Sequence, residues 1–157
     1  METVAFISDE LAQFLESGLS IVVATRDGEL QPDGAAAWAA RVHEDRTHLT
    51  VYLYEEAAAR MLRNLTSYPQ IALDFDRPTT HRACQVKGLY LSSRPAEPWE
   101  RALVYQQADA FAADLDAIGI PGAMLQGWKT WPCTAFQVRA TALFEQTPGP
   151  GTGERLP

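Results

Sequence analysis

Residues 57–88, AAARMLRNLTSYPQIALDFDRPTTHRACQVKG, carry one helix pattern followed by two strand patterns. Apolar residues recur at helical spacing over 57–66 and predict a short amphipathic helix. The buried side of this helix would consist of Ala58, Met61, Leu62 and Leu65. Pro69 cannot continue a helix, so we expect the chain to turn there. Residues 70–76 alternate between apolar and polar side chains and predict a half-buried strand, and a second strand over 81–91 follows a loop.

The first part of the chain predicts one helix and one hairpin. Ser8 can cap the free amides of a helix, and the acidic residues after it suit the positive end of the helix dipole. Residues 20–26 form a short β-branched run that is typical of a buried strand. Asp27-Gly28 predicts a hairpin turn in which the glycine takes a positive φ.

The alanine-rich segment 31–43 permits two readings. Its alanines favour a helix when they are taken alone, but the segment lies between two hairpin signals, so we interpret it as one long strand. Small side chains inside a strand make sense where a flat ligand or a second subunit approaches the sheet. A tight contact between the sheet and a helix explains them equally well.

The remaining segments complete an α+β fold. Residues 48–54 and 134–145 alternate as strands do, and 99–115 predict the longest helix, with Trp99 on its buried side. Short connections between about six strands favour antiparallel pairing. We therefore predict a six-stranded antiparallel β-barrel, closed or split, with flanking helices. A single domain would span 1–147, and a flexible tail would follow over 148–157.

Composition narrows the function class. The chain has 157 residues and a net charge of −7, which argues against a protein that tracks nucleic acid phosphates. No stretch reaches the roughly 18 apolar residues of a membrane span, so we expect no membrane association. Cys84 and Cys133 lack metal-ligand spacing, as do the three histidines, so we predict no metal site. Two reduced, buried thiols fit a cytoplasmic location.

The segment Leu62-Arg63-Asn64-Leu65, followed by Pro69 and an apolar strand, resembles the pyridoxamine 5′-phosphate oxidase-like superfamily of FMN-binding split β-barrels. Val86-Lys87-Gly88 resembles a Val-x-Gly motif near the end of the next strand in that family. The resemblance covers roughly residues 8–91, with a looser match for the last helix and strand. It implies a homodimer with FMN bound between the subunits; related members carry a deazaflavin or heme instead.

The resemblance also implies a set of cofactor-binding residues. Arg60 matches a basic residue that holds the flavin phosphate, whereas Met61 occupies a position that is often Lys or Arg. Arg41 lies near a strand position that is often Lys, and Tyr54 or Thr50 would supply a hydroxyl group. The later strand would meet the flavin ring through Gln85, or through Ala83 if the alignment is fixed on Gly88. Weaker candidates for the phosphate are Arg41, Arg63, Gln85 and Lys87.

Physical chemistry supports a phosphate site on the short helix, with a plain alternative. Arg60 and Arg63 are three residues apart, so they can lie on neighbouring surface positions, and Arg suits a phosphate because its guanidinium binds with two parallel hydrogen bonds. The alternative is an ordinary solvated edge of a surface helix. Trp128-Lys129-Thr130-Trp131 can likewise cover a flavin ring, make a dimer contact or anchor the core.

Two functions follow from these patterns. The first is an FMN-dependent oxidoreductase that acts on an unknown small molecule, with the flavin supplying the redox chemistry. The second is a non-enzymatic binding module on the same fold that holds heme, a deazaflavin or no cofactor.

Asp74 and Asp76 share a strand face and can do acid–base work, although a solvated sheet face is the simpler reading.

Overall fold

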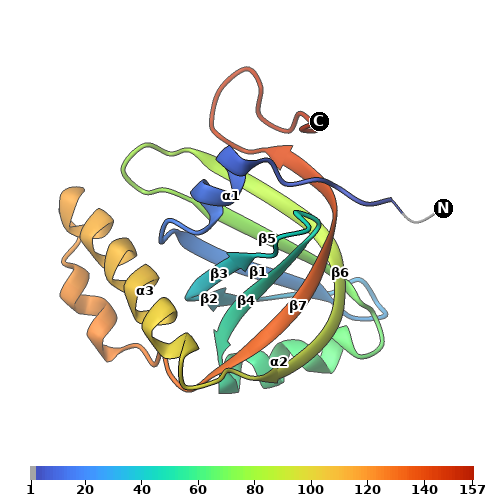
Figure 1. Cartoon of the computed structure of the whole chain (residues 1–157), viewed down its shortest axis with the longest axis horizontal. Helices are drawn as coiled ribbons and strands as arrows, with labels where there is room; N and C mark the ends of the chain where they lie inside the picture. The colour runs from blue at the N-terminus through green and yellow to red at the C-terminus, as the bar shows by residue number, and fades with distance from the viewer. Residues whose placement is uncertain (1–2) are drawn as a thin grey trace.

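Seven antiparallel strands form a strongly curled sheet, with helices packed around it (Figure 1). The computed structural model describes residues 3–157. In chain order the elements are α1 (Asp9–Leu15), β1 (Ser20–Arg26), β2 (Pro32–Ala37), β3 (Ala39–Val42), β4 (His48–Tyr54), α2 (Glu55–Leu65), β5 (Gln70–Asp76), β6 (Ala83–Pro95), α3 (Glu100–Ala117), the 3-10 helix η1 (Gly122–Gly127) and β7 (Cys133–Glu145).

The sheet closes into a barrel through the alanine-rich segment. The strand order is β2-β1-β5-β6-β7-β4-β3, so β2 and β3 lie at its two ends. These two strands are separated in sequence only by Trp38, whose backbone N–H donates to the carbonyl of Tyr52 at 2.8 Å. The prediction of β structure over 31–43 is confirmed, but the prediction of six strands is wrong. There are seven because the chain changes partners at Trp38, from β1 to β4.

The barrel interior is filled by the alternate apolar side chains of the strands. Ile71, Leu73 and Phe75 of β5 are buried, as their spacing predicts. Helix α2 begins at Glu55, two residues earlier than predicted, and lies across one end of the barrel (Figure 1). Its buried residues Ala58, Met61 and Leu65 join the same core, so the predicted apolar side of this helix is confirmed.

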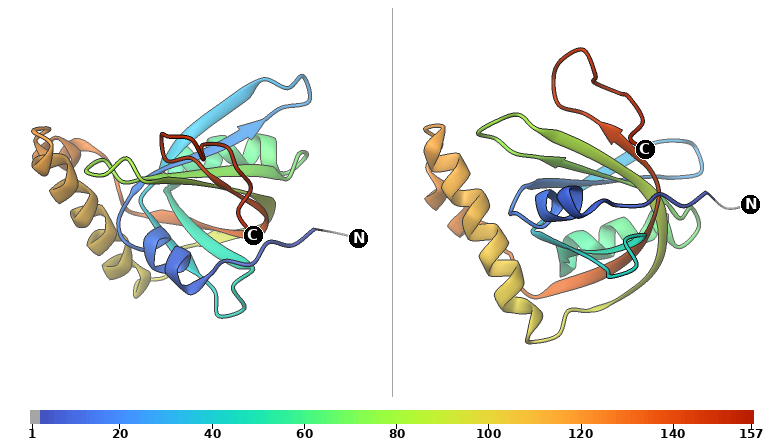
Figure 2. Two further views of the ribbon diagram at one scale, coloured as in Figure 1. Left: turned by 90° about the horizontal axis from the view of Figure 1, so that it is seen from above. Right: turned by 45° about the horizontal axis from the view of Figure 1, so that its top comes forward.

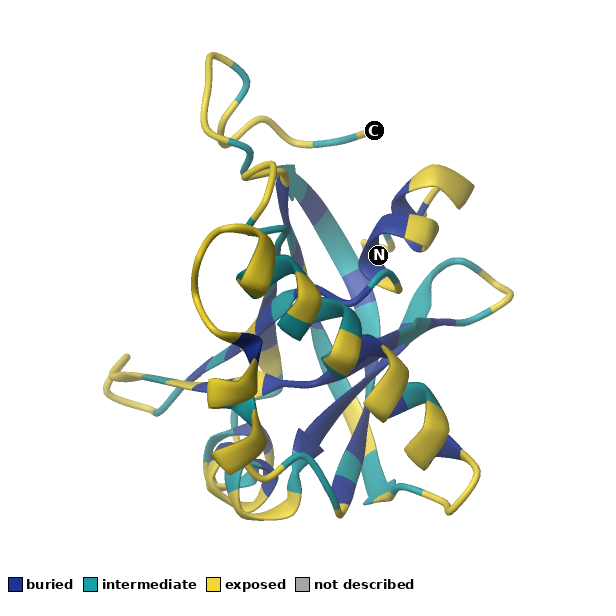
Figure 3. Cartoon of the chain, turned by 90° about the vertical axis from the view of Figure 1, so that its left-hand side faces the viewer, coloured by how far each residue is buried: buried dark blue, intermediate teal, exposed yellow. Residues whose placement is uncertain are grey.

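Helix α3 covers the outside of β3 and β4 and creates a second apolar core. Val104 packs there with Ala39 and Tyr52, and all three are buried. The opposite side of α3 faces solvent (Figure 3). Trp99, predicted to lie on the buried side, is 58% exposed because it precedes the helix. The buried residues of α3 are Glu100, Val104 and Gln107.

Hydrogen bonds from buried polar side chains hold α3 against the sheet. The buried Glu100 carboxylate accepts hydrogen bonds from the Tyr52 hydroxyl at 2.7 Å and from both terminal nitrogens of Arg94, each at 2.7 Å. Burial alone would raise the pKa of Glu100, but the hydrogen bonds outweigh it and lower the pKa to about 2. Further along, the Gln107 side chain bonds both the N–H and the carbonyl of Ala40. The alanines of β3 therefore allow a close contact between the sheet and this helix, one of the two readings given above.

Two local details differ from the predictions. Strand β6 continues to Pro95, four residues beyond the predicted end of the strand over 81–91. In the β1–β2 hairpin, which projects beyond the rest of the sheet (Figure 2), the residue with positive φ is Leu30 (64°) and not Gly28. The absence of a side chain at Gly28 instead makes room for the Tyr68 ring.

The last ten residues return to the barrel after leaving β7 (Figure 1). The N–H of Leu156 donates to the carbonyl of Leu143 at 2.8 Å, and the N–H of Gly153 donates to the carbonyl of Glu145 at 2.6 Å. Flexibility of 148–157 stays a prediction.

Candidate functional site

Arg60 projects from α2 towards the outer face of β2. Its guanidinium donates to the carbonyl oxygen of Gly34, and its Nε lies 3.4 Å from a carboxylate oxygen of Asp33. Both side chains of this ion pair are exposed, at 45% and 37%. Arg60 is thus held at the surface and remains open to a ligand.

A groove of about 350 Å³ runs beside Arg60, and we call it the Arg60 groove. Its volume lies within the range of small-molecule sites, about 300–1,000 Å³. Strand β2 contributes the floor, α2 and the end of β4 one wall, and the segment after η1 the other wall. The lining residues are Ala35, Ala36, Trp38, Tyr54, Glu56, Ala57, Arg60, Trp128 and Lys129.

Two cations from distant parts of the sequence flank this groove. Lys129 Nζ lies 5.6 Å from the centre of the Tyr54 ring and 4.0 Å from a carboxylate oxygen of Glu56. The ion pairs of Lys129 and Arg60 are exposed, and such pairs are worth only about 0–1 kcal/mol. A phosphate can therefore displace either carboxylate at little cost and accept hydrogen bonds from the cation that is released.

The floor and the aromatic residues suit a flat ring. On this part of β2 the exposed side chain is the methyl group of Ala36, because Ala35 is buried and points to the opposite face. Trp38 and Trp128 stand edge to face, with ring centres 5.7 Å apart and planes at 71°. This arrangement fits a ligand that has a planar body and an anionic end. The alanines of β2 thus agree with the second reading of this segment, a flat surface that a ligand can approach.

The structure brings together some of the predicted site residues and separates others. Arg60 and Tyr54 share the groove, but Arg63 is exposed on α2 outside it. Arg41 lies beneath α3, with its guanidinium 5.6 Å from the centre of the Trp99 ring. Its Nε is buried and has no hydrogen-bond partner among the described residues. Arg41 is therefore remote from the groove.

Gln85 and Lys87 lie on the outer face of β6. Gln85 is opposite Asp74 of β5. Lys87 lines a separate groove of about 390 Å³ with Arg26. Neither residue lines the Arg60 groove. Burial raises the pKa of Asp74, and the nearby Asp76 carboxylate raises it further.

Sequence reasoning missed Lys129 as a cation beside Arg60. The segment containing it was singled out for its tryptophans, as a possible cover for a ring, and Trp128 does line the groove. No periodic pattern links residue 129 to residue 60, because they meet only through the closure of the barrel. The available signal was a lysine between two tryptophans in an otherwise irregular segment.

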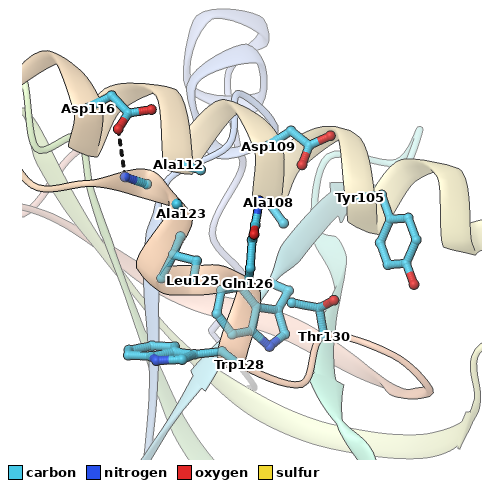
Figure 4. A pocket seen from close by; sticks show the side chains of 12 residues that line it. Tyr105, Ala108, Asp109, Ala112, Asp116, Ala123, Leu125, Gln126, Trp128 and Thr130 are labelled. Atoms are coloured by element: carbon cyan, nitrogen blue, oxygen red, sulfur yellow. Dashed lines mark hydrogen bonds between the residues drawn. The ribbon is translucent and has the colours of Figure 1, made fainter.

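A neighbouring cavity of about 460 Å³ has the opposite charge (Figure 4). It lies between α3 and η1, and we call it the acidic cavity because Asp109 and Asp116 line it. Asp116 also accepts a hydrogen bond from the N–H of Gly122 at 2.6 Å. Trp38 and Trp128 line this cavity as well. Its carboxylates repel a phosphate, whereas Asp33 and Glu56 beside the Arg60 groove are each paired with a cation.

The histidines lie elsewhere. His43 Nε2 is 2.8 Å from the Thr50 hydroxyl, and His48 Nδ1 is 2.7 Å from an Asp45 carboxylate oxygen. His81 is exposed in the β5–β6 loop. Within residues 3–157, no three His, Cys, Asp or Glu side chains are grouped so that they could hold a metal ion. Cys84 and Cys133 are buried and free, and burial raises the pKa of each thiol to about 12.

Sequence comparison gives no match. No protein-family model and no curated protein matches the chain. In the described part of the chain, no helix has the length and apolar character needed to cross a membrane.

Structure comparison gives a consistent picture. An F420 reductase superposes with a TM-score of 0.53 at 20% identity, covering 83% of this chain and 93% of its own. HupZ from Group A Streptococcus gives 0.57 at 15% identity, covering 94% and 100%. A proposed pyridoxamine 5′-phosphate oxidase from Lactobacillus delbrueckii gives 0.55 at 13% identity, covering 92% and 99%.

At these identities the likeness establishes the fold alone. Two observations support the same fold. The strands form a curled antiparallel sheet, and the superpositions cover nearly the whole length of these neighbours. The chain has the fold of these three neighbours, and the predicted split β-barrel fold is confirmed.

Proposed function

We propose that this protein binds a flavin, FMN, in the Arg60 groove and acts as an FMN-dependent oxidoreductase on a small molecule. One observation carries this proposal: Arg60 and Lys129, from two separate elements, flank a small-residue floor that Trp38 and Trp128 border. The flavin supplies the electron transfer. Two buried, free thiols suit a cytoplasmic location.

Each residue of the groove has a role that follows from its chemistry. Arg60 and Lys129 hold the phosphate by charge-assisted hydrogen bonds. The small, exposed side chain of Ala36 lets the ring lie close to β2. The Tyr54 hydroxyl orients the ligand at the end of β4, and Trp128 excludes water from one side of the groove.

The proposed assembly is a homodimer. The outer sheet face presents short side chains at Ala24 and Ala72, which lie opposite each other on β1 and β5. A second subunit on this face would complete the site, as the resemblance to split-barrel flavoproteins implies. Gln85 and Lys87 would then face the partner subunit.

A deazaflavin is the second candidate, and one observation favours it. Met61 is fully buried, so α2 offers Arg60 to the groove without a second adjacent cation. A site with fewer cations holds a phosphate less strongly, so it suits a cofactor that the protein contacts along more of its length. The F420 reductase among the structural neighbours is named for such a cofactor. A protein that holds its cofactor without turnover uses the same groove.

The experiment is a titration of the purified protein with FMN, followed by flavin fluorescence and the visible spectrum. Arg60→Glu should raise the dissociation constant about 10- to 100-fold, the effect of losing a charge-assisted hydrogen bond. Arg63→Glu is the matched control, because it makes the same charge change one turn along α2, outside the groove. Absence of FMN binding, or equal losses in the two variants, would contradict the proposal.

A further inference from the structure

A second cavity next to the Arg60 groove is almost wholly apolar, and we call it the apolar cavity. Its volume is about 390 Å³, and it lies between the outer face of the β1–β2 hairpin and the end of α3 with η1. None of the described residues that line it is charged. They are Ser20, Ile21, Val22, Ala36, Ala37, Trp38, Phe111, Leu115, Ile120, Met124, Leu125 and Trp128.

Large apolar side chains at the edge of this cavity are unusually exposed. Val22 is 45% exposed, Ile120 44% and Met124 65%, and they come from β1 and from the segment that follows α3. Scattered exposed apolar residues need no explanation, but a contiguous group marks a binding site. These side chains meet around one hollow, so its apolar surface is available to a ligand.

The apolar cavity and the Arg60 groove share three residues. Ala36, Trp38 and Trp128 line both. A molecule in the cavity therefore lies against a molecule whose ring rests on the floor of the groove. Trp128 also lines the acidic cavity (Figure 4).

We infer that the apolar cavity binds an uncharged, apolar small molecule with a ring or a short hydrocarbon body. A charged group would lose its hydration there without gaining a partner, which is costly. The cavity is bounded on two sides by layers of the same chain, and its volume is that of a small-ligand site. It therefore suits a small molecule rather than the flat surface of a second subunit. That this molecule is the substrate rests on the proposed function; that it binds here does not.

The test uses the uncharged fluorescent probe N-phenyl-1-naphthylamine with the full-length protein, without added flavin. We expect saturable binding of one probe per chain, seen as energy transfer from tryptophan, because Trp38 and Trp128 line the cavity. Ile120→Asp should weaken binding at least about tenfold, since it places a carboxylate beside the apolar probe. Met124→Glu provides a second, more exposed variant and should act in the same direction.

Ile118→Asp is the matched control. Ile118 is 46% exposed against 44% for Ile120, lies two residues away, and does not line the cavity. Its affinity for the probe should stay within about twofold of the wild type, because no wall of the cavity changes. Lack of saturable probe binding, or equal losses in Ile118→Asp and Ile120→Asp, would overturn the inference. A change of oligomeric state in Ile120→Asp would also overturn it, since the cavity would then hold a second subunit.

Flavin binding separates the two claims. Probe binding that responds as expected in a protein that fails to bind FMN supports the apolar site and contradicts the proposed function. FMN binding in a protein that shows no probe site supports the function and overturns the inference.

Discussion

At the scale of single residues, Arg60 and Met61 show how far sequence reasoning reaches. Helical spacing correctly places Met61 on the buried side of α2 and leaves Arg60 outside it. The spacing says nothing of Asp33 or Lys129, which reach this region from β2 and from the segment after η1. The positions of these two charged side chains near Arg60 therefore could not be predicted from any local sequence pattern.

Met61→Lys tests whether this position can serve the cofactor site. Met61 is fully buried, and the Thr25 hydroxyl lies 3.8 Å from its sulfur. A lysine there would bury its charge or force it out of the core, so we expect the free energy of unfolding to fall by about 3 kcal/mol or more. Urea unfolding measures this change, with Met61→Leu as the volume-matched control. A Met61→Lys variant as stable as the wild type would contradict the placement of Met61 in the core.

Glu100 gives a prediction about pH. Its pKa is lowered from 4.5 to about 2 in the folded protein. A carboxylate with a lowered pKa stabilises the fold above its unfolded pKa, and that contribution is lost as the pH falls through the folded value. We therefore expect the free energy of unfolding to decline between about pH 4.5 and about pH 2.

Glu100→Gln should remove much of that decline. It should also cost about 3 kcal/mol at pH 7, because it leaves Arg94 and Tyr52 without their buried anion. Glu97→Gln is the control, since Glu97 is an exposed acid three residues away. Urea unfolding at a series of pH values makes the comparison. The same pH dependence in wild type and Glu100→Gln would show that the buried pair does not act in this way.

At the scale of elements, most strands and helices could be predicted because their patterns are local. The exception is the long strand over 31–43, which divides at Trp38. The strand divides because Ala37 pairs with β1 whereas Ala39 pairs with β4. Both partner strands lie outside the segment 31–43, so its own sequence does not reveal them. Trp99 was misplaced for a related reason, because the buried side of α3 is set by Glu100 and Gln107, two polar residues.

The close pairing of β6 with β7 around Gly88 offers a test at the scale of elements. A Cβ atom at Gly88 would lie 2.5 Å from the carbonyl oxygen of Arg139 and 2.7 Å from a methyl group of Val138. Gly88→Ala should therefore force the strands apart and destabilise the fold by about 1–3 kcal/mol. Gly34→Ala is the control in β2, where the nearest atom is 3.6 Å away. Thermal unfolding should show a clear loss for Gly88→Ala and almost none for Gly34→Ala, whereas equal losses would contradict the close packing at Gly88.

At the scale of the whole molecule, closure of the barrel assembles the candidate site. The floor comes from β2, one cation from α2, and the other from the segment that leads into β7. The prediction of a split barrel with flanking helices is confirmed, because the strand patterns and their short connections indicate antiparallel pairing whatever the exact number of strands. The position of the segment 128–131 could not be predicted, because its irregular backbone carries no periodic signal.

The proposed homodimer gives a prediction at this scale. The chain has a mass of 17.3 kDa, so light scattering should report twice that value for the protein in solution. Ala72→Arg should shift the protein towards the monomer, because it places a long charged side chain on the outer sheet face. Ile118→Asp serves as a control at the end of α3, away from that face. A monomeric wild type would contradict the dimer.

The central claim is that Arg60 binds the phosphate of a cofactor whose ring lies on β2, and one comparison tests it most directly. FMN and riboflavin differ by the phosphate, so titrations of wild type and Arg60→Glu with both ligands isolate its contribution. We predict that wild type binds FMN about tenfold or more tightly than riboflavin, and that Arg60→Glu abolishes this difference. Equal affinity of the wild type for the two ligands, or an unchanged preference for FMN in Arg60→Glu, would contradict it.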